Sequence, residues 1–268
     1  MRNRITVIIP ILLLMIMGCG GFEYSPNQYF SGDTPRDINQ RNIKRLQEEQ
    51  GDARIRFILT GDSQRSYKDA EDLVKVINQI PEIDFVLLAG DISDFGLSQE
   101  MEWVDKVFSK LQRPYLGVIG NHDLVATGEK AFKRMYGELN YSFVYQGVKF
   151  VCHNTNSRET SFSGNVPDLE WLKKEFSPET GVEAYIAVAH VPPGDGDFDR
   201  SLEAKYINII NTSPNTLAAL YAHQHAYNLF YPGNQHTIPY IVTTGIEKRK
   251  FVLIEILNGK LTFENIEY

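Results

Sequence analysis

Carboxylate, amide and imidazole side chains recur directly behind short apolar runs of this 268-residue chain. They are Asp62, Gln64, Asp91, Asp94, Asn121, His122, Asp123, His190, His223 and His225. Oxygen and imidazole donors without thiolate suit divalent Mn, Fe, Zn or Mg. Each group alone is ambiguous, because Gly-Asp is often only a turn and a single histidine is often structural. Their joint occurrence predicts a metal site.

These side chains need a scaffold that brings five distant segments together. Apolar, β-branched runs at 55–59, 85–89, 115–119 and 185–189 alternate with helical patterns at 67–80, 98–111 and 168–176, which predicts βαβ units. The chain beyond residue 217 is mostly strand, ending in a hairpin signal at Asn258-Gly259. We therefore expect an α/β fold in which two mixed sheets pack face to face between flanking helices, with the polar groups at the strand ends.

The order of the polar blocks resembles a known family. The blocks are Gly61-Asp62-x-Gln64, Gly90-Asp91-x-x-Asp94, Gly120-Asn121-His122-Asp123, His190 and His223-x-His225. Together they resemble the motifs of the calcineurin-like metallophosphoesterases, from about residue 55 to residue 225. The resemblance implies a four-layer α/β sandwich over residues 53–268. It also implies a metal-dependent hydrolase that cleaves phosphomonoesters or phosphodiesters by attack of a hydroxide bridging two metals.

The resemblance assigns a role to each residue. One metal would be held by Asp62, Gln64, Asp91 and His225, and the second by Asp91, Asn121, His190 and His223. Asp91 would bridge the two, and His122 would be the general acid, oriented by Asp94. Two cations about 3.5–4 Å apart can activate a water and stabilise phosphoryl oxygens. We expect two divalent ions, with Mn or Fe favoured and Zn or Mg also compatible.

Two positions depart from the family pattern. The first block usually ends in His, where this chain has Gln64, and the family often has Gly where this chain has Ala222. A neutral amide oxygen is a harder ligand than imidazole, so Gln64 should favour Mn or Mg at its site over Zn or Fe. An alternative is that this site is weak or empty and that the protein works with one metal.

Three further residues are candidates for contact with substrate. Arg65 and Arg158 could bind non-bridging phosphate oxygens, and the alternative for each is a solvated surface arginine. His153 ends a predicted strand, where it could face the site. The loop at 191–199 carries three aspartates, which could face solvent or capture a cation.

The N-terminus predicts export. Arg2 and Arg4 precede an apolar stretch over residues 5–17, which is too short for a membrane span and is typical of a secretory signal. The sequence Gly18-Cys19 at its end resembles a bacterial lipobox, where cleavage precedes a cysteine that is then lipidated. We expect a signal peptide at 1–18, a membrane anchor on Cys19, a tether at 19–52 that could include a short helix around 38–49, and a location at the bacterial cell envelope. An ordinary cleaved signal remains the alternative.

The charge composition of the chain indicates which classes of binding partner to expect. The net charge of −7 and the lack of a lysine or arginine run disfavour duplex nucleic acid as the main partner, which leaves a small phosphoester as the expected substrate. Oligomeric state is undetermined. The competing hypothesis to a hydrolase is a non-catalytic or single-metal binding lipoprotein on the same fold. Retention of His122 and Asp94 favours the hydrolase, because a pure binder needs no proton donor.

Overall fold

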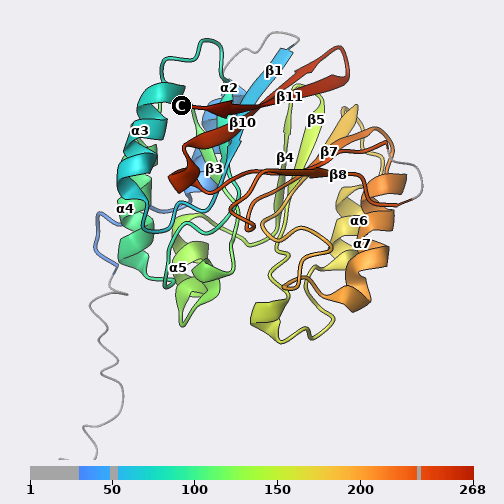
Figure 1. Ribbon diagram of the computed structural model, residues 1–268, viewed down its shortest axis with the longest axis horizontal. Helices are drawn as coiled ribbons and strands as arrows, with labels where there is room; N and C mark the ends of the chain where they lie inside the picture. The colour runs from blue at the N-terminus through green and yellow to red at the C-terminus, as the bar shows by residue number, and fades with distance from the viewer. Residues whose placement is uncertain (1–29, 49–53, 234–236) are drawn as a thin grey trace, which may run out of the picture.

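Two β-sheets form the centre of the protein, seen in a computed structural model that describes residues 30–48, 54–233 and 237–268 (Figure 1). The first sheet contains β1 (Arg54–Thr60), β2 (Phe85–Leu88), β3 (Tyr115–Gly117), β10 (Lys250–Leu257) and β11 (Lys260–Glu267). The second contains β4 (Tyr141–Tyr145), β5 (Val148–Cys152), β6 (Ala184–Val188), β7 (Thr216–Tyr221), β8 (Asn228–Phe230) and β9 (Tyr240–Val242).

Both sheets are mixed. The first has the order β11-β10-β1-β2-β3. Strands β1, β2 and β3 run parallel to one another, β10 runs antiparallel to β1, and β11 runs antiparallel to β10. The second has the order β4-β5-β6-β7-β9-β8, with antiparallel edges around the parallel strands β5, β6, β7 and β9. Parallel strands place their carboxyl ends at one edge of a sheet, so the loops after β1, β2, β3, β6 and β7 can share one site.

Helices cover the outer faces of the sheets (Figure 1). On the first sheet lie α3 (Tyr67–Ile77), α4 (Ser98–Phe108) and α5 (Gly128–Met135). On the second lie α6 (Leu169–Glu175) and α7 (Arg200–Thr212). The resulting order of helix, sheet, sheet, helix confirms the four-layer sandwich.

Aromatic side chains fill the space between the two sheets. Phe57 stacks on Phe85 of the same sheet at 4.9 Å between ring centroids. Across the interface, Phe85 meets Phe150 edge-on at 5.2 Å. All three are buried, and such pairs stabilise a core beyond the area they remove from water. Cys152 is also buried in this core, which raises the pKa of its thiol to about 12.

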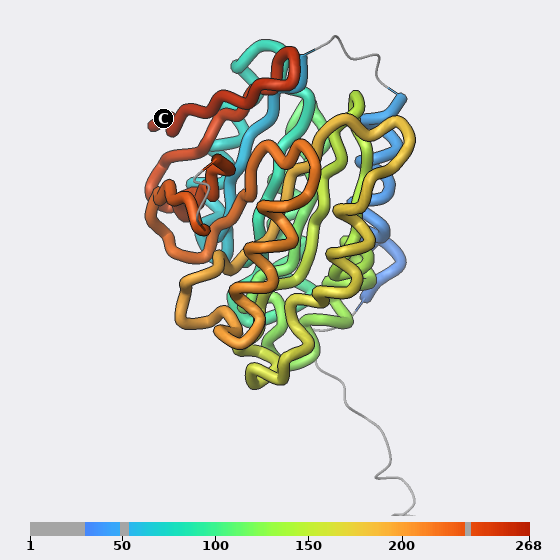
Figure 2. Tube along the Cα trace, turned by 90° about the vertical axis from the view of Figure 1, so that its right-hand side faces the viewer, coloured from blue at the N-terminus to red at the C-terminus, as the bar shows by residue number. Residues whose placement is uncertain are grey.

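Helix α2 (Ile38–Glu48) corrects the extent of the expected tether. It lies within the range 19–52, yet it contacts β3 and β4, and Ile38 and Leu46 are buried in the hydrophobic cores. Asn39 donates to the carbonyl oxygen of Gly117 and accepts from its N–H, at 2.9 and 2.8 Å. Figure 2 shows the helix, in blue, along one edge of the molecule. Residues 30–48 therefore belong to the folded domain, whereas 1–29, with Cys19, lie outside the described residues.

Helix α7 was not among the expected elements, although its signals are present in the sequence. Asp199 accepts a hydrogen bond from the Ser201 N–H at the helix start. Leu202, Tyr206 and Ile209 then face the core at helical spacing. The polar Asp-rich loop before it obscured this start. Within the described ranges, no helix has the length and apolarity to cross a bilayer.

Candidate metal centre

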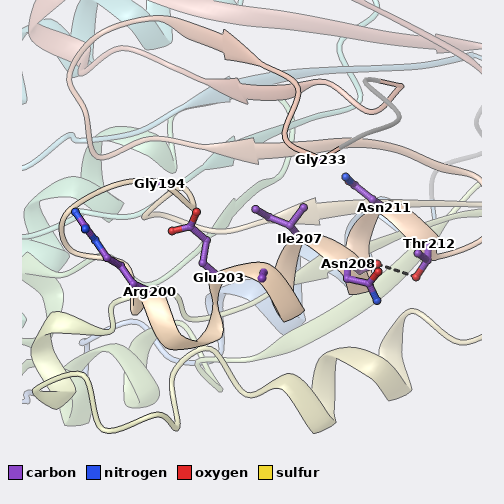
Figure 3. A pocket seen from close by; sticks show the side chains of 9 residues that line it. Gly194, Arg200, Glu203, Ile207, Asn208, Asn211, Thr212 and Gly233 are labelled. Carbon is purple, nitrogen blue, oxygen red and sulfur yellow. Dashed lines mark hydrogen bonds between the residues drawn. The ribbon is translucent and has the colours of Figure 1, made fainter.

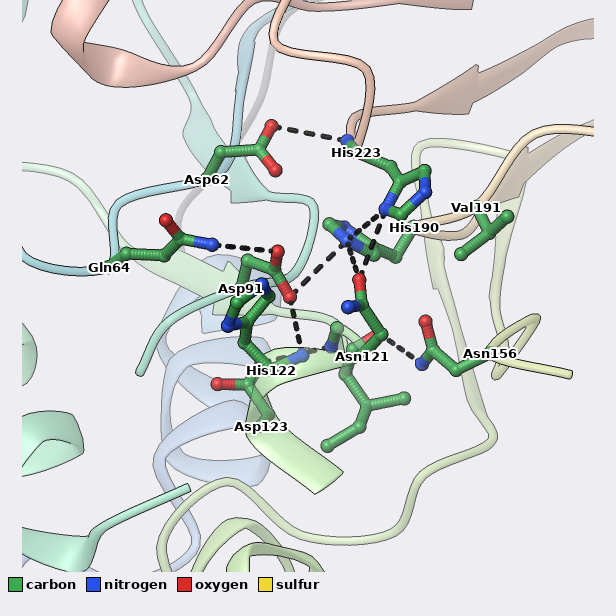
Figure 4. A network of polar contacts seen from close by, with 12 residues as sticks. Asp62, Gln64, Asp91, Asn121, His122, Asp123, Asn156, His190, Val191 and His223 are labelled. Atoms are coloured by element: carbon green, nitrogen blue, oxygen red, sulfur yellow. Dashed lines mark hydrogen bonds and ion pairs between the residues drawn. The ribbon is translucent and has the colours of Figure 1, made fainter. Parts of the chain in front are cut away.

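The candidate metal ligands come together at the carboxyl ends of strands from both sheets, and Figure 4 labels all of them except His225. Asp62 and Gln64 follow β1, Asp91 follows β2, Asn121 follows β3, His190 follows β6, and His223 and His225 follow β7. Asp62, Asp91 and His190 are almost fully buried. The two sheets thus contribute oxygen donors and imidazoles, respectively, to one cluster.

Four donor atoms of the predicted second metal set converge closely. His190 Nε2 lies 3.0 Å from Asn121 Oδ1, 3.3 Å from Asp91 Oδ1 and 3.3 Å from His223 Nδ1. His223 Nδ1 is in turn 3.0 Å from Asn121 Oδ1. Donor atoms about 3 Å apart are what a divalent cation with bonds near 2.1 Å requires. This set fits one ion without rearrangement of the chain.

The first set is built around Asp62. Its Oδ1 is buried without a hydrogen-bond partner and faces His225 Nε2 at 3.5 Å. Donor atoms of Asp62, Asp91 and His225 all lie within 4.8 Å of one another. Gln64 donates from its amide nitrogen to Asp91 Oδ2 at 3.0 Å, so the amide lies beside the shared carboxylate. A buried carboxylate oxygen left unpaired is costly, and a cation would satisfy it.

In two histidines Nδ1 carries the proton, so the unprotonated Nε2 points toward the cluster. His190 Nδ1 lies 2.7 Å from the Ala89 carbonyl oxygen, which can only accept, so Nδ1 carries the proton and Nε2 faces the cluster. His225 Nδ1 lies 2.9 Å from Glu247 Oε1, again leaving Nε2 toward Asp62. Metal-binding histidines are usually fixed in this way from the outer side.

Burial and neighbouring charges shift the pKa values of the cluster residues in opposite directions. Burial raises the pKa of Asp62 to about 6. Burial also acts to raise the pKa of Asp91, but the charge and hydrogen bond of His190 outweigh it and lower that pKa to about 2. Burial alone would lower the pKa of His190, and the neighbouring Asp91 raises it to about 9.

Five of the candidate ligands also have a strained backbone conformation. Asp62, Gln64, Asp91, His223 and His225 all have positive φ, between 29° and 72°. Non-glycine residues rarely adopt this region, and they persist in it where the surrounding structure holds them, often at functional sites. Ala222 packs directly against Gly61, where an added methyl group would come within 2.6 Å of the Ala222 Cβ. A small pair is required at that contact.

His122 lies at the edge of the cluster, partly exposed (Figure 4). Its backbone N–H donates to Asp91 Oδ1 at 2.9 Å, which ties it to the shared carboxylate. Its ring Nδ1 donates to the backbone carbonyl of Asp94 at 2.8 Å, while the Asp94 carboxylate is farther away, at 3.6 Å. Asp94 therefore orients His122 chiefly through its main chain, a detail that sequence reasoning did not reach.

Asp123 has a structural role that the sequence did not reveal. Its buried carboxylate accepts from the N–H and hydroxyl of Ser93, both at 2.7 Å, and from the N–H groups of Ile92 and Gly120. It thus joins the loops after β2 and β3, which carry Asp91 and His122. Burial raises its pKa to about 6.

The three candidate substrate residues lie in different surroundings. Arg65 is exposed and pairs with Asp94 at 3.3 Å, and Arg158 is exposed and pairs with Asp197 at 3.2 Å, so both lie beside the cluster. His153 is buried in the core instead, where Nδ1 bonds to the Val151 carbonyl and Nε2 to the Tyr206 hydroxyl. The expected substrate contact of His153 is therefore wrong, because both ring nitrogens are engaged under helix α7.

The loop at 191–199 turns toward the cluster. Asp195 Oδ1 and Asp197 Oδ2 lie 3.5 and 3.6 Å from His223 Nε2, on the side of the ring opposite Asn121. The contact with His223 lowers the pKa of Asp195. Glu247 Oε1 likewise lies 2.9 Å from Nδ1 of His225, the ring nitrogen that faces away from the cluster. Sequence spacing gave no sign of these contacts, because the residues lie 22 to 28 positions from their histidines.

A separate cavity of about 760 Å³ lies along α7 (Figure 3). Its lining includes Arg200, Glu203 and Asn211, and it reaches the loop at 191–199 through Gly194. None of its nine lining residues is a candidate metal ligand.

The family model of the calcineurin-like phosphoesterases matches residues 55–227, the span that holds every candidate ligand. The chain belongs to the calcineurin-like phosphoesterase family. It is therefore a metal-dependent phosphoesterase, of a family that works with a dinuclear metal centre. The donor atoms of Asp91, Asn121, His190 and His223 fit one ion of such a centre in type and spacing, whereas Gln64 turns its amide nitrogen toward Asp91 and would have to turn its oxygen inward to bind the other.

Two sequence relatives are phosphodiesterases. A 3′,5′-cyclic-nucleotide phosphodiesterase of Nostoc sp. is 24% identical over 198 residues, covering 67% of this chain and 74% of that protein. Sphingomyelin phosphodiesterase 1 of Caenorhabditis elegans is 24% identical over 213 residues, covering 60% of this chain but only 38% of the relative.

Solved structures share the fold of this phosphoesterase. A dimetal phosphatase from Danio rerio superposes with a TM-score of 0.64 at 13% identity, covering 80% of this chain and 97% of the other. A purple acid phosphatase from yellow lupin gives 0.63 at 14% identity, covering 81% and 52%. At this level of identity, the likeness establishes the architecture alone.

Proposed function

We propose that this phosphoesterase hydrolyses small phosphodiesters, using two divalent cations held by the cluster around Asp91. The observation that carries the proposal is the convergence of oxygen and imidazole donors from both sheets onto one shared buried carboxylate. Both sequence relatives are phosphodiesterases by name, which favours a diester over a monoester. Asp62, Gln64, Asp91 and His225 would hold one ion, and Asp91, Asn121, His190 and His223 the other.

The bound cations would activate water and neutralise charge on the phosphoryl group. The residues around them have distinct tasks. His122, fixed through Nδ1 by the Asp94 carbonyl, would present Nε2 and, in its doubly protonated imidazolium form, give the Nε2 proton to the departing oxygen. Arg65, held beside Asp94, binds a non-bridging phosphate oxygen, which positions the ester against His122.

The choice of metal follows from the donors. Gln64 replaces an imidazole by a neutral amide, so we propose Mn as the preferred ion, with Fe, Zn and Mg as the competitors. Titration of the metal-free protein with each ion, followed by activity, ranks them. Full activity with Zn alone would contradict the preference.

The test of the function is a metal-reconstituted assay on bis(para-nitrophenyl) phosphate and para-nitrophenyl phosphate. We expect Mn-dependent turnover with the diester preferred, and a loss of at least 100-fold in kcat for Asp91→Asn. Turnover of the monoester alone would contradict the diester preference. No turnover of either ester, despite bound Mn, would replace the hydrolase with a binding protein.

Export and anchoring are a further part of the proposal, supported by the apolar stretch at 5–17 and by Gly18-Cys19. Lipidation would tether the domain at the bacterial envelope, where small phosphoesters are accessible. Labelling of cells with a radioactive fatty acid should mark the wild-type protein and leave Cys19→Ser unmarked. Equal labelling of both would remove the anchor.

A further inference from the structure

Three imidazoles face the metal cluster, and each meets an acceptor on its outer side. For His190 the acceptor is a backbone carbonyl, and for His225 it is Glu247. For His223 the outer nitrogen is Nε2, and two carboxylates, from Asp195 and Asp197, approach it to 3.5 and 3.6 Å. His223 is thus the imidazole with two carboxylates behind it.

We propose that Asp195 and Asp197 are positioning residues that hold the proton of His223 on Nε2 and so keep Nδ1 free as a metal ligand. The inference rests on the proposed dinuclear centre. Nδ1 is the nitrogen that lies 3.0 Å from Asn121 Oδ1 and 3.3 Å from His190 Nε2, inside the second metal set. A protonated Nδ1 would offer no lone pair there, so the tautomer decides whether the set is complete.

The carboxylate pair is itself held in place. Asp195 accepts from the Asp197 N–H at 3.1 Å and from Gln224 Nε2 at 3.0 Å. Asp197 accepts from Arg158 Nη1 with both oxygens at 3.2 Å, and its own carbonyl accepts from the Arg158 N–H. Each carboxylate therefore has a second partner beyond His223. A pair fixed in this way can orient an imidazole at little further loss of side-chain entropy.

A cation held by Asp195, Asp197 and His223 is the competing interpretation, since their donor atoms lie within 4.8 Å of one another. Two features weigh against it. Arg158 already neutralises Asp197, and His223 would have to bind cations through both nitrogens at once, which requires loss of both ring protons. Electrostatic attraction of an Nε2–H group to the two carboxylates needs neither condition, so the observations favour it.

The experiment compares full-length wild-type protein with Asp195→Ala/Asp197→Ala, Asp195→Asn/Asp197→Asn and the charge-matched control Glu159→Ala/Glu203→Ala. Each is stripped of metal, and Mn²⁺ binding is followed by titration calorimetry. We expect two ions per wild-type chain, a 10- to 100-fold weaker second site in the double alanine variant, partial recovery in the double asparagine variant and wild-type binding in the control.

A second measurement reports the tautomer directly. Nitrogen NMR of the metal-free protein, with His223 assigned through a His223→Gln spectrum, should show mainly Nε2 protonated in the wild type, where two carboxylates outweigh the neutral Asn121 oxygen that lies 3.0 Å from Nδ1. The double alanine variant should show a mixture of both tautomers. If that variant does not fold, Asp195→Asn and Asp197→Asn singly serve for the same reading.

The outcomes separate the two levels of proposal. Unchanged Mn²⁺ affinity and an unchanged His223 tautomer in the double alanine variant overturn the positioning role and leave the phosphodiesterase function intact. Three ions in the wild type and two in that variant overturn it in favour of a third cation. A wild type that binds no Mn²⁺ overturns the proposed function together with this inference.

Discussion

At the scale of single residues, the centre combines oxygen donors on one sheet with imidazoles on the other, and its finer control lies in contacts that motifs do not encode. Asp94 illustrates the point. The sequence pairs its carboxylate with His122, whereas the structure assigns the main contact to its backbone carbonyl. The same holds for His223 and His225, whose outer partners come from separate loops.

The role of Asp94 predicts an unequal pair of variants. His122→Ala removes the proton donor and should lower kcat by about 10²- to 10⁴-fold. Asp94→Asn keeps the carbonyl that holds Nδ1 and should lower kcat by less than about 10-fold, with a rise in KM because Arg65 loses its partner. Steady-state kinetics on the diester with Mn measures both. Equal losses in kcat would show that the carboxylate is essential to the proton transfer.

His153 predicts a pH dependence of stability. Burial lowers its pKa from 6.5 to about 4, so the folded protein binds fewer protons than the unfolded chain between these values. The free energy of unfolding should therefore fall as the pH drops from 6.5 to 4, by up to about 3 kcal/mol from this residue. His153→Gln should flatten that part of the profile, as measured by urea unfolding of metal-free protein. Parallel profiles for variant and wild type would contradict the assignment.

At the scale of elements, α2 completes a sheet edge. β3 is the last strand of its sheet, and an open edge exposes unpaired backbone groups. Asn39 bonds to both backbone groups of Gly117, and Asn42 donates to the Tyr115 carbonyl at 2.7 Å. Side chains of a helix thus take the place of a further strand, and the domain begins earlier than its composition indicates.

This edge contact predicts a destabilised variant. Asn39→Ala leaves a buried N–H and C=O unpaired, at a cost of about 2–4 kcal/mol. Gln40→Ala, at an exposed position of the same helix, is the control and should change stability by less than about 0.5 kcal/mol. Urea unfolding measures both. Similar values for the two variants would mean that α2 adds little to the edge.

At the scale of the whole molecule, the cluster joins the two sheets at one end of their interface. Asp62, Asp91 and Asn121 come from the first sheet, and His190, His223 and His225 from the second. Ions bound there would bridge the layers that otherwise meet through the aromatic core. Metal binding should therefore stabilise the complete fold as well as activate it.

Thermal unfolding tests this link. Mn²⁺ at about 100 times its Kd should add about 2.7 kcal/mol to the free energy of unfolding and raise the Tm, and a chelator should reverse the effect. Asp91→Asn removes the shared ligand and should lose most of the shift. An equal shift in that variant would place the stabilising ion elsewhere.

The sequence alone determined the architecture and the candidate ligands, because strand periodicity and polar residues behind strands are local properties of the chain. It could not determine α7, whose start lies in an acidic loop. It also could not determine the packing of α2, because the polar composition of that segment is typical of a tether. It also misplaced His153, since the two faces of a strand end look alike in sequence. The outer partners of the histidines were decided by tertiary structure only, because loops 22 to 28 residues apart meet solely when both sheets are assembled.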